Sequence, residues 1–150
     1  PEGPHATPNS SSILPHIARQ ALVALDAGQA CVDAIGSPNQ SGALMALRYM
    51  HSTETVDALI KSFGDVDEPD LRQRIARSLV RLVNKEKPYK GETWWKTRPD
   101  TRGPYYYPTA WERTDKITRA LVKMAKQSDP ATRFVIIELA KKDRVELPGL

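Results

Sequence analysis

Two stretches of this chain repeat one another: IARQALVALDAGQACVDAI at residues 17–35 and GALMALRYMHSTETVDALI at residues 42–60. In each, apolar residues return every three to four positions, which is the period of one face of an α-helix. The pentapeptide ALVAL at 21–25 recurs as ALMAL at 43–47, as SLVRL at 78–82 and more loosely as VIIEL at 135–139. The second helix recurs too, because VDAI at 32–35 matches VDAL at 56–59. The sequence predicts an all-α chain of helical hairpins, each of which needs its neighbours to bury its apolar face.

Local signals predict where several helices begin and end. Glycine favours the left-handed conformation that closes a helix, so helices are expected to end at Gly28 and Gly36. A capping residue followed by proline is expected to begin helices at Ser37-Pro38, Glu68-Pro69 and Asp129-Pro130. Thr109 and Glu112 have the spacing of a capping box for a later helix. Two apolar stripes are expected on these helices: Ile17, Ala21, Leu22 and Leu25, and Ile117, Ala120, Leu121 and Met124.

The cadence of these repeats resembles that of HEAT-like α-helical repeats, over roughly residues 14–84 and 114–142. The resemblance implies an α-solenoid, in which helical hairpins stack into an extended array. A non-repeating helical bundle is the alternative. We expect a flexible tail at residues 1–12, a repeat domain at 13–150, and one long ordered aromatic-rich loop inserted at 88–110.

Composition limits the class of protein. The chain has 150 residues, enough for one domain, and lacks a run of the roughly 18–20 apolar residues that a membrane span needs. Its single cysteine, Cys31, excludes an internal disulfide framework and is expected to be buried. The net charge of +4 hides a basic middle, since residues 71–126 contain 15 Lys and Arg but 5 Asp and Glu. This favours an anionic partner, with solvated surface and internal ion pairing as the alternative.

The insertion, PYKGETWWKTRPDTRGPYYYPTAW at residues 88–111, holds seven of the ten aromatic residues. Aromatic faces can stack on sugars or bases, and arginines between prolines can grip carboxylate, sulfate or phosphate. The insertion can also fold back as a plug over the neighbouring helices, and the two roles are compatible. The candidate binding residues are Trp94, Trp95, Arg98, Asp100, Arg102, Tyr105, Tyr106 and Trp111.

Two basic ridges flank the insertion, each with the spacing of one helix face. The first ridge is Arg74, Arg77, Arg81 and Lys85, and the second is Lys116, Arg119, Lys123 and Lys126. Because the two helices are expected to pair, the ridges could lie near each other beside the insertion.

The segment WWKTRPDTRGPYYYPTAWERT at residues 94–114 resembles an insertion in the HEAT-like region of large bacterial PVC-type haem-binding CxxCH proteins. That resemblance implies export to the periplasm or cell surface, within a larger multidomain protein associated with carbohydrate oxidation. This chain contains no CxxCH motif, so covalent haem cannot attach within it. The resemblance therefore carries a scaffold role and no redox chemistry.

The sequence contains no HExxH, GxSxG or Walker motif, and its histidines are scattered. We therefore expect no enzyme activity, no metal and no cofactor. Since the chain begins with Pro1 and shows no signal peptide, we expect a processed form or a piece of a longer protein. The predicted function is a scaffold that contacts a protein partner or neighbouring domain through residues 88–111. The alternative is a polyanion binder, for nucleic acid or acidic polysaccharide, that uses the ridges; recognition of sugars by the aromatics is a third possibility.

Overall fold

The computed structural model describes residues 13–88, 105 and 107–150, and this part of the chain is mostly helical. Its helices are α1 (Ile13–Ala24), α2 (Gly28–Asp33), α3 (Gln40–Leu47), α4 (Thr53–Asp65), α5 (Pro69–Leu82), α6 (Thr114–Gln127) and α7 (Pro130–Asp143). Two short strands, β1 (Lys85–Glu86) and β2 (Pro108–Thr109), pair between α5 and α6. The predicted flexible tail at residues 1–12 lies outside the described residues.

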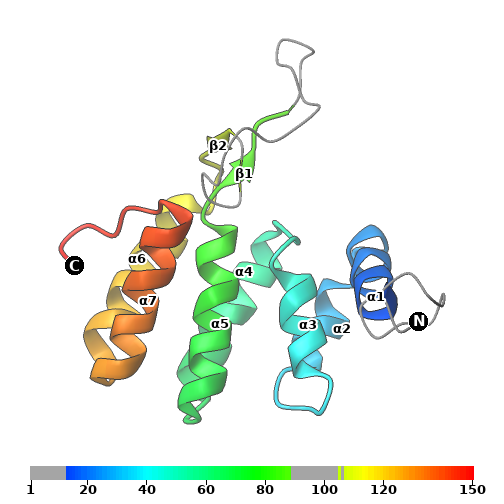
Figure 1. Ribbon diagram of the computed structural model, residues 1–150, viewed down its shortest axis with the longest axis horizontal. Helices are drawn as coiled ribbons and strands as arrows, with labels where there is room; N and C mark the ends of the chain where they lie inside the picture. Colours follow the sequence, from blue (N-terminus) through cyan, green and yellow to red (C-terminus); the bar gives the residue numbers. More distant parts are fainter. Residues whose placement is uncertain (1–12, 89–104, 106) are drawn as a thin grey trace, which may run out of the picture.

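The helices form two layers that follow the order of the chain. In the first layer α1, α3, α5 and α7 contact one another in that order, and in the second layer α2, α4 and α6 do the same. Figure 1 shows the resulting row, with α1 at one end and the α6–α7 pair at the other. Helix-on-helix layers of this kind bury the apolar stripe of each helix against its neighbours.

Helix α5 is the centre of the core because it contacts α3, α4, α6 and α7. Its side chains Ile75, Leu79 and Leu82 are wholly buried. The buried hydroxyl of Ser78 donates a hydrogen bond of 3.1 Å to the carbonyl of Leu44 on α3, so a polar group in the core is satisfied. Arg74 and Arg77 of α5 are exposed, whereas Arg72 and Arg81 are half-buried.

Several predicted helix boundaries are confirmed. Pro69 occupies the first turn of α5, and Asp129 caps α7 by accepting a hydrogen bond from the Thr132 N–H. The helix expected to end at Gly36 ends earlier, at Asp33, and Gly36 lies in the turn that follows with a φ of +87°, the left-handed conformation that glycine adopts without strain. The stripe on α6 is confirmed as well, since Ile117, Leu121 and Met124 are buried and Ala120 packs beside them.

Other boundaries are wrong. Gly28 begins α2 rather than ending α1, and the left-handed residue is Asp26, with a φ of 49°. Gly28 packs closely instead, because a Cβ there would lie 3.2 Å from the Thr55 hydroxyl, tighter than most Cβ contacts. Ser37 and Pro38 form a turn, since α3 begins two residues later, at Gln40. The hydroxyl of Ser37 bonds backbone groups inside that turn.

The stripe predicted on α1 is also wrong in part. Leu22 packs against the core, but Ile17 is 55% exposed and Leu25 is 78% exposed. No residue of α1 is buried, because this helix contacts α3 from the end of the row. The apolar period therefore predicted a helix correctly, but it did not show whether another helix would cover the apolar stripe of that helix.

The ends of the insertion pair with each other, which the sequence did not predict. Lys85 lies opposite Thr109 and Glu86 opposite Pro108 in an antiparallel ladder, and the Lys87 N–H donates to the carbonyl of Tyr107 at 2.9 Å. Since Thr109 belongs to β2, the predicted capping box does not form, and α6 begins at Thr114. None of the described helices is both long and apolar enough to cross a membrane.

Candidate functional site

The end of α5 is held by side chains from three other segments. The last carbonyl groups of an α-helix lack partners within the helix, so other donors must satisfy them. Here the carbonyls of four consecutive residues, 81–84, each accept a hydrogen bond from a side chain. We call the four donors the α5 cap: His51, Tyr105, Trp111 and Thr114.

Two donors of the α5 cap come from the segment that leads into α6. The indole Nε1 of Trp111 donates to the carbonyl of Leu82 at 2.8 Å, and the hydroxyl of Thr114 donates to the carbonyl of Val83 at 2.6 Å. The same hydroxyl accepts from the Trp111 N–H at 2.9 Å. One threonine oxygen thus joins the end of α5 to the beginning of α6.

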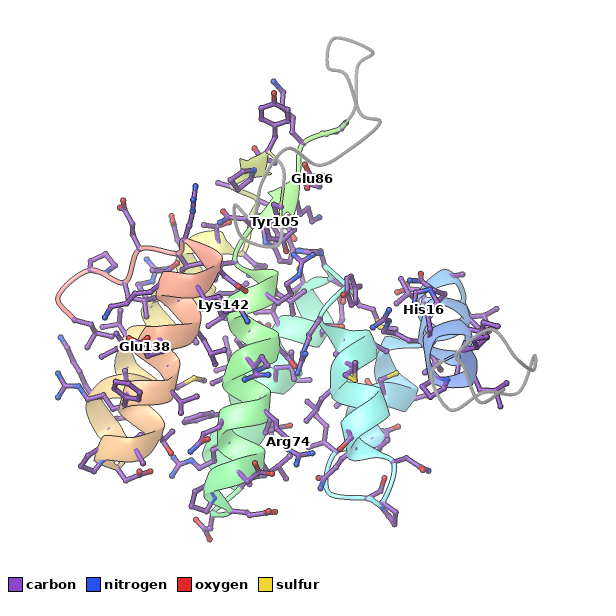
Figure 2. All side chains as sticks on the ribbon, in the orientation of Figure 1. His16, Arg74, Glu86, Tyr105, Glu138 and Lys142 are labelled. Atoms are coloured by element: carbon purple, nitrogen blue, oxygen red, sulfur yellow. The ribbon has the colours of Figure 1, made fainter. Side chains whose placement is uncertain are left out.

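The other two donors come from the residues just before α4 and from the end of the insertion. His51 Nε2 lies 2.8 Å from the carbonyl of Asn84, and because a carbonyl accepts, this nitrogen carries the proton. The hydroxyl of Tyr105 donates to the carbonyl of Arg81 and lies 3.2 Å from His51 Nε2. Figure 2 shows Tyr105 at this end of α5, below β1.

Burial shifts the pKa values of both groups away from physiological pH. Burial lowers the pKa of His51, and the nearby cations Lys85 and Arg81 lower it further, so the imidazole is neutral. Burial raises the pKa of Tyr105 to about 12, so the phenol keeps its proton. His51 also meets the Trp111 ring edge to face, at 5.4 Å between centroids. This geometry makes the α5 cap a set of neutral hydrogen-bond donors.

Cations of the first layer stack on aromatic rings beside the α5 cap. The guanidinium of Arg81 lies 3.9 Å from the centroid of the Tyr105 ring and 5.3 Å from that of Tyr49. Arg19 lies 5.3 Å from the Tyr49 ring, and Lys85 lies 4.4 Å from the Trp111 ring. A guanidinium that stacks on a ring in this way is held in one orientation, and the N–H groups along the edge of its plane can still donate hydrogen bonds.

The structure places the two basic ridges against different neighbours. On α5, Arg74 pairs with Asp70 at 2.7 Å and donates to the Ser41 hydroxyl at 2.6 Å, so this ridge faces α3. On α6, Lys116 pairs with Asp57 of α4 at 2.6 Å. Arg74, Arg77 and Arg81 therefore belong to the layer of α3, α5 and α7, whereas Lys85 lies in β1 and Lys116 belongs to the layer of α4 and α6. The expected meeting of the two ridges beside the insertion does not occur at these residues.

Of the second ridge, Arg119, Lys123 and Lys126 are exposed on α6. They face solvent on the far side of the α6 stripe from the buried Leu121. These three cations have the position expected of a solvated helix face.

A hollow of about 430 Å³ lies between α3, α5 and α7. Leu44, Met45 and Val135 give it an apolar floor. Three arginines stand around it: Arg48, Arg74 and Arg77. Figure 2 shows Arg74 on the α3 side of α5. The sequence pointed to Arg74 and Arg77 but missed Arg48, because a lone arginine at a helix end carries no periodic signal.

The predicted binding residues are only partly described. Tyr105 is 6% exposed, and Trp111 is half-buried against the core. The polar atoms of both side chains donate hydrogen bonds to carbonyl groups at the end of α5. Six further candidates lie outside the described residues: Trp94, Trp95, Arg98, Asp100, Arg102 and Tyr106. Sequence reasoning also missed His51 and Thr114 as partners of the insertion, because their contacts join distant segments.

Comparison with known proteins finds no matching family model, no similar curated protein and no similar solved structure. Within the described residues, no group of three His, Cys, Asp or Glu is placed to hold a metal ion. Cys31 is buried, as expected, and burial raises the pKa of its thiol. The class supported by the geometry is therefore a mostly helical protein of two packed helix layers, and the HEAT-like and PVC-type resemblances stay predictions.

Proposed function

We propose that this chain is a non-catalytic helical-repeat scaffold. In this proposal HEAT-like hairpins form a solenoid, and residues 88–111 contact a protein partner or a neighbouring domain of a larger exported protein. The sequence repeats support the solenoid, as does the regular order in which each helix packs on the next helix of its own layer. Export rests on the sequence resemblance alone.

The single observation that carries the proposal is the α5 cap. The strand β1, which follows α5, pairs with β2 at the C-terminal end of the insertion, and Tyr105 and Trp111 from that same end donate to the end of α5. A binding segment anchored at both ends loses less conformational entropy when a partner binds, which favours affinity. Anchoring with neutral, mutually bonded donors suits a structural base for a contact.

Site-specific photo-cross-linking tests the proposal. A photoreactive phenylalanine analogue replaces Trp95 in the insertion or, as the control, Arg119 on the exposed face of α6. After irradiation in extracts of the source cells, we expect position 95 to give a discrete cross-linked protein that position 119 does not give, identified by mass spectrometry. Equal products from both positions would contradict a contact role for the insertion.

A second variant separates partner contact from a plug role. Residues 89–104 are replaced by a short Gly-Ser linker, and the melting temperature and the co-purification of the partner identified at position 95 are measured. Loss of the partner with a melting temperature lowered by less than about 4 °C, roughly 1 kcal/mol for a domain of this size, supports partner contact. A partner that still co-purifies would place the contact outside residues 89–104 and contradict the proposal.

A further inference from the structure

The face of α3, α5 and α7 carries more positive charge than its own carboxylates neutralise. Arg48 and Arg77 lie near each other, and burial together with Arg77 lowers the pKa of the Arg48 guanidinium. Neither arginine makes a salt bridge with a described carboxylate, whereas Arg74 is paired with Asp70. Asp143 is the carboxylate near both of them, and burial raises its pKa. This face therefore has unneutralised donors at the edge of the hollow.

Arg48 also has an unused donor in a buried position. Its Nε is buried and has no hydrogen-bond partner among the described residues. That nitrogen is closed to an incoming group, but Arg48 lines the hollow, where a carboxylate can bond the part of the guanidinium that faces it. The apolar floor of Leu44, Met45 and Val135 beside it can accept an apolar side chain. The site thus combines guanidinium donors that can bind an anion with apolar side chains that can contact a hydrophobic group.

We infer that this hollow binds an acidic segment of a protein partner in an extended, polyproline II-like conformation. One carboxylate of the segment bonds Arg48, the next bonds Arg77, and an apolar residue between them contacts Met45. This site is separate from the insertion and does not depend on the contact proposed for residues 88–111.

The spacing of the helices sets the spacing of the acidic residues. Neighbouring packed helices lie about 8–10 Å apart. A polyproline II segment rises about 3.1 Å per residue and completes a turn in three residues, so every third side chain returns to one face after about 9 Å. If acidic residues occur at every third position, a segment that crosses α3 and α5 therefore places one acidic residue on each of the two helices.

An acidic peptide fits this face better than a nucleic acid does. Asp70 lines the hollow, and Asp143 lies near Arg48 and Arg77. A row of phosphates carries a charge at every residue and is repelled by both carboxylates, whereas a peptide that is acidic only at every third position brings fewer charges toward them. A phosphate backbone also offers no apolar group that could pack against Leu44, Met45 and Val135.

Fluorescence anisotropy tests the inference with the full chain. The probe is a fluorescein-labelled peptide of repeated Glu-Pro-Leu triplets, about twelve residues long, and its control has Gln in place of Glu. At low salt we expect the Glu peptide to bind at least about tenfold more tightly than the Gln peptide, because each charged pair is worth about a factor of ten. Absence of binding by the Glu peptide, or equal binding of both, overturns the inference.

Matched arginine variants locate the site. We expect Arg77→Gln to weaken binding about tenfold and Arg48→Gln to do the same, while Arg119→Gln on the other layer changes it less than about twofold. Arg77 is exposed, so its variant keeps the test valid if loss of the half-buried Arg48 impairs folding. Equal losses from Arg77→Gln and Arg119→Gln overturn the site.

Two further arms separate this inference from other interpretations. A single-stranded oligonucleotide that binds more tightly than the peptide, and loses affinity equally in the Arg77 and Arg119 variants, replaces the inference with nucleic-acid binding. Replacement of residues 89–104 by a linker is expected to leave peptide affinity unchanged. If it abolishes peptide binding, the peptide is bound by the insertion and the hollow is not the site.

Discussion

Thr114 joins the beginning of α6 to the end of α5 with one hydroxyl group, and Thr114→Val removes that group while keeping the shape of the side chain. The hydroxyl donates to the carbonyl of Val83 at 2.6 Å and accepts from the N–H of Trp111 at 2.9 Å. Val83 is 3% exposed and lies just past the last helical residue of α5, so its carbonyl has little access to water. The substitution leaves two backbone groups without their partner.

The expected cost follows from those two groups. A buried polar group left unsatisfied costs about 1–3 kcal/mol, and since water can reach the partly exposed side of Thr114, we expect about 2 kcal/mol in total. For a domain of this size that loss lowers the melting temperature by about 4–8 °C. Thermal unfolding followed by circular dichroism measures the shift, and urea unfolding gives the free energy independently.

Thr118→Val is the matched control on the same helix. The Thr118 hydroxyl donates to the carbonyl of Thr114 at 2.9 Å, but that carbonyl already accepts a backbone hydrogen bond within α6. We therefore expect a change of less than about 0.5 kcal/mol. If the two variants melt at the same temperature, the α5 cap does not contribute to stability as described, and the anchoring argument for the insertion fails with it.

The remaining predictions concern the core, the buried histidine and the thiol. Leu79→Ala should cost about 2–5 kcal/mol in urea unfolding because Leu79 is wholly buried, whereas Leu25→Ala, at a residue 78% exposed, should cost less than about 0.5 kcal/mol; similar values would contradict the assigned core. Because burial lowers the pKa of His51 in the folded state, its contribution to stability is complete above pH about 6.5 and is lost as the pH falls through the lowered value. The difference in unfolding free energy between wild type and His51→Gln should therefore shrink on acidification from neutral pH, and a difference independent of pH would show that His51 is not buried as a neutral base. Cys31 should react slowly with a thiol reagent in the native protein and rapidly in urea, since it is 3% exposed and burial raises its pKa; rapid native reaction would show that α2 is not packed as described.

Much of the helical fold could be predicted because its signals are local. The stripe of Ile117, Leu121 and Met124 indicated α6 and its buried face together, since the same residues set the helical period and the core. Asp129 before a proline indicated the beginning of α7, because the capping bond joins residues three positions apart. Such signals do not depend on the rest of the chain.

The candidate site could be predicted only in part. The sequence singled out Tyr105 and Trp111 for their aromatic rings, but in the structure their polar atoms serve the end of α5. Arg74 and Arg77 were recognised as a ridge, yet the hollow beside them depends on Arg48, which comes from another helix. The spacing of residues within one helix predicts a ridge, whereas a hollow forms only where residues of several helices come together.

By itself, the sequence determined that the chain forms helices, where most of them run, and which residues of α6 turn inward, because apolar period and caps act over a few residues. Only the tertiary structure decided that Ile17 and Leu25 stay exposed and that Thr109 pairs in a strand with Lys85 instead of capping α6. It also decided that four carbonyls at the end of α5 are satisfied from distant segments and that the two ridges face different neighbours. The physical reason is that the packing of the helices decides which distant residues become partners. His51 and Asn84, for example, are more than thirty positions apart, and a contact over that separation leaves no periodic pattern in the sequence.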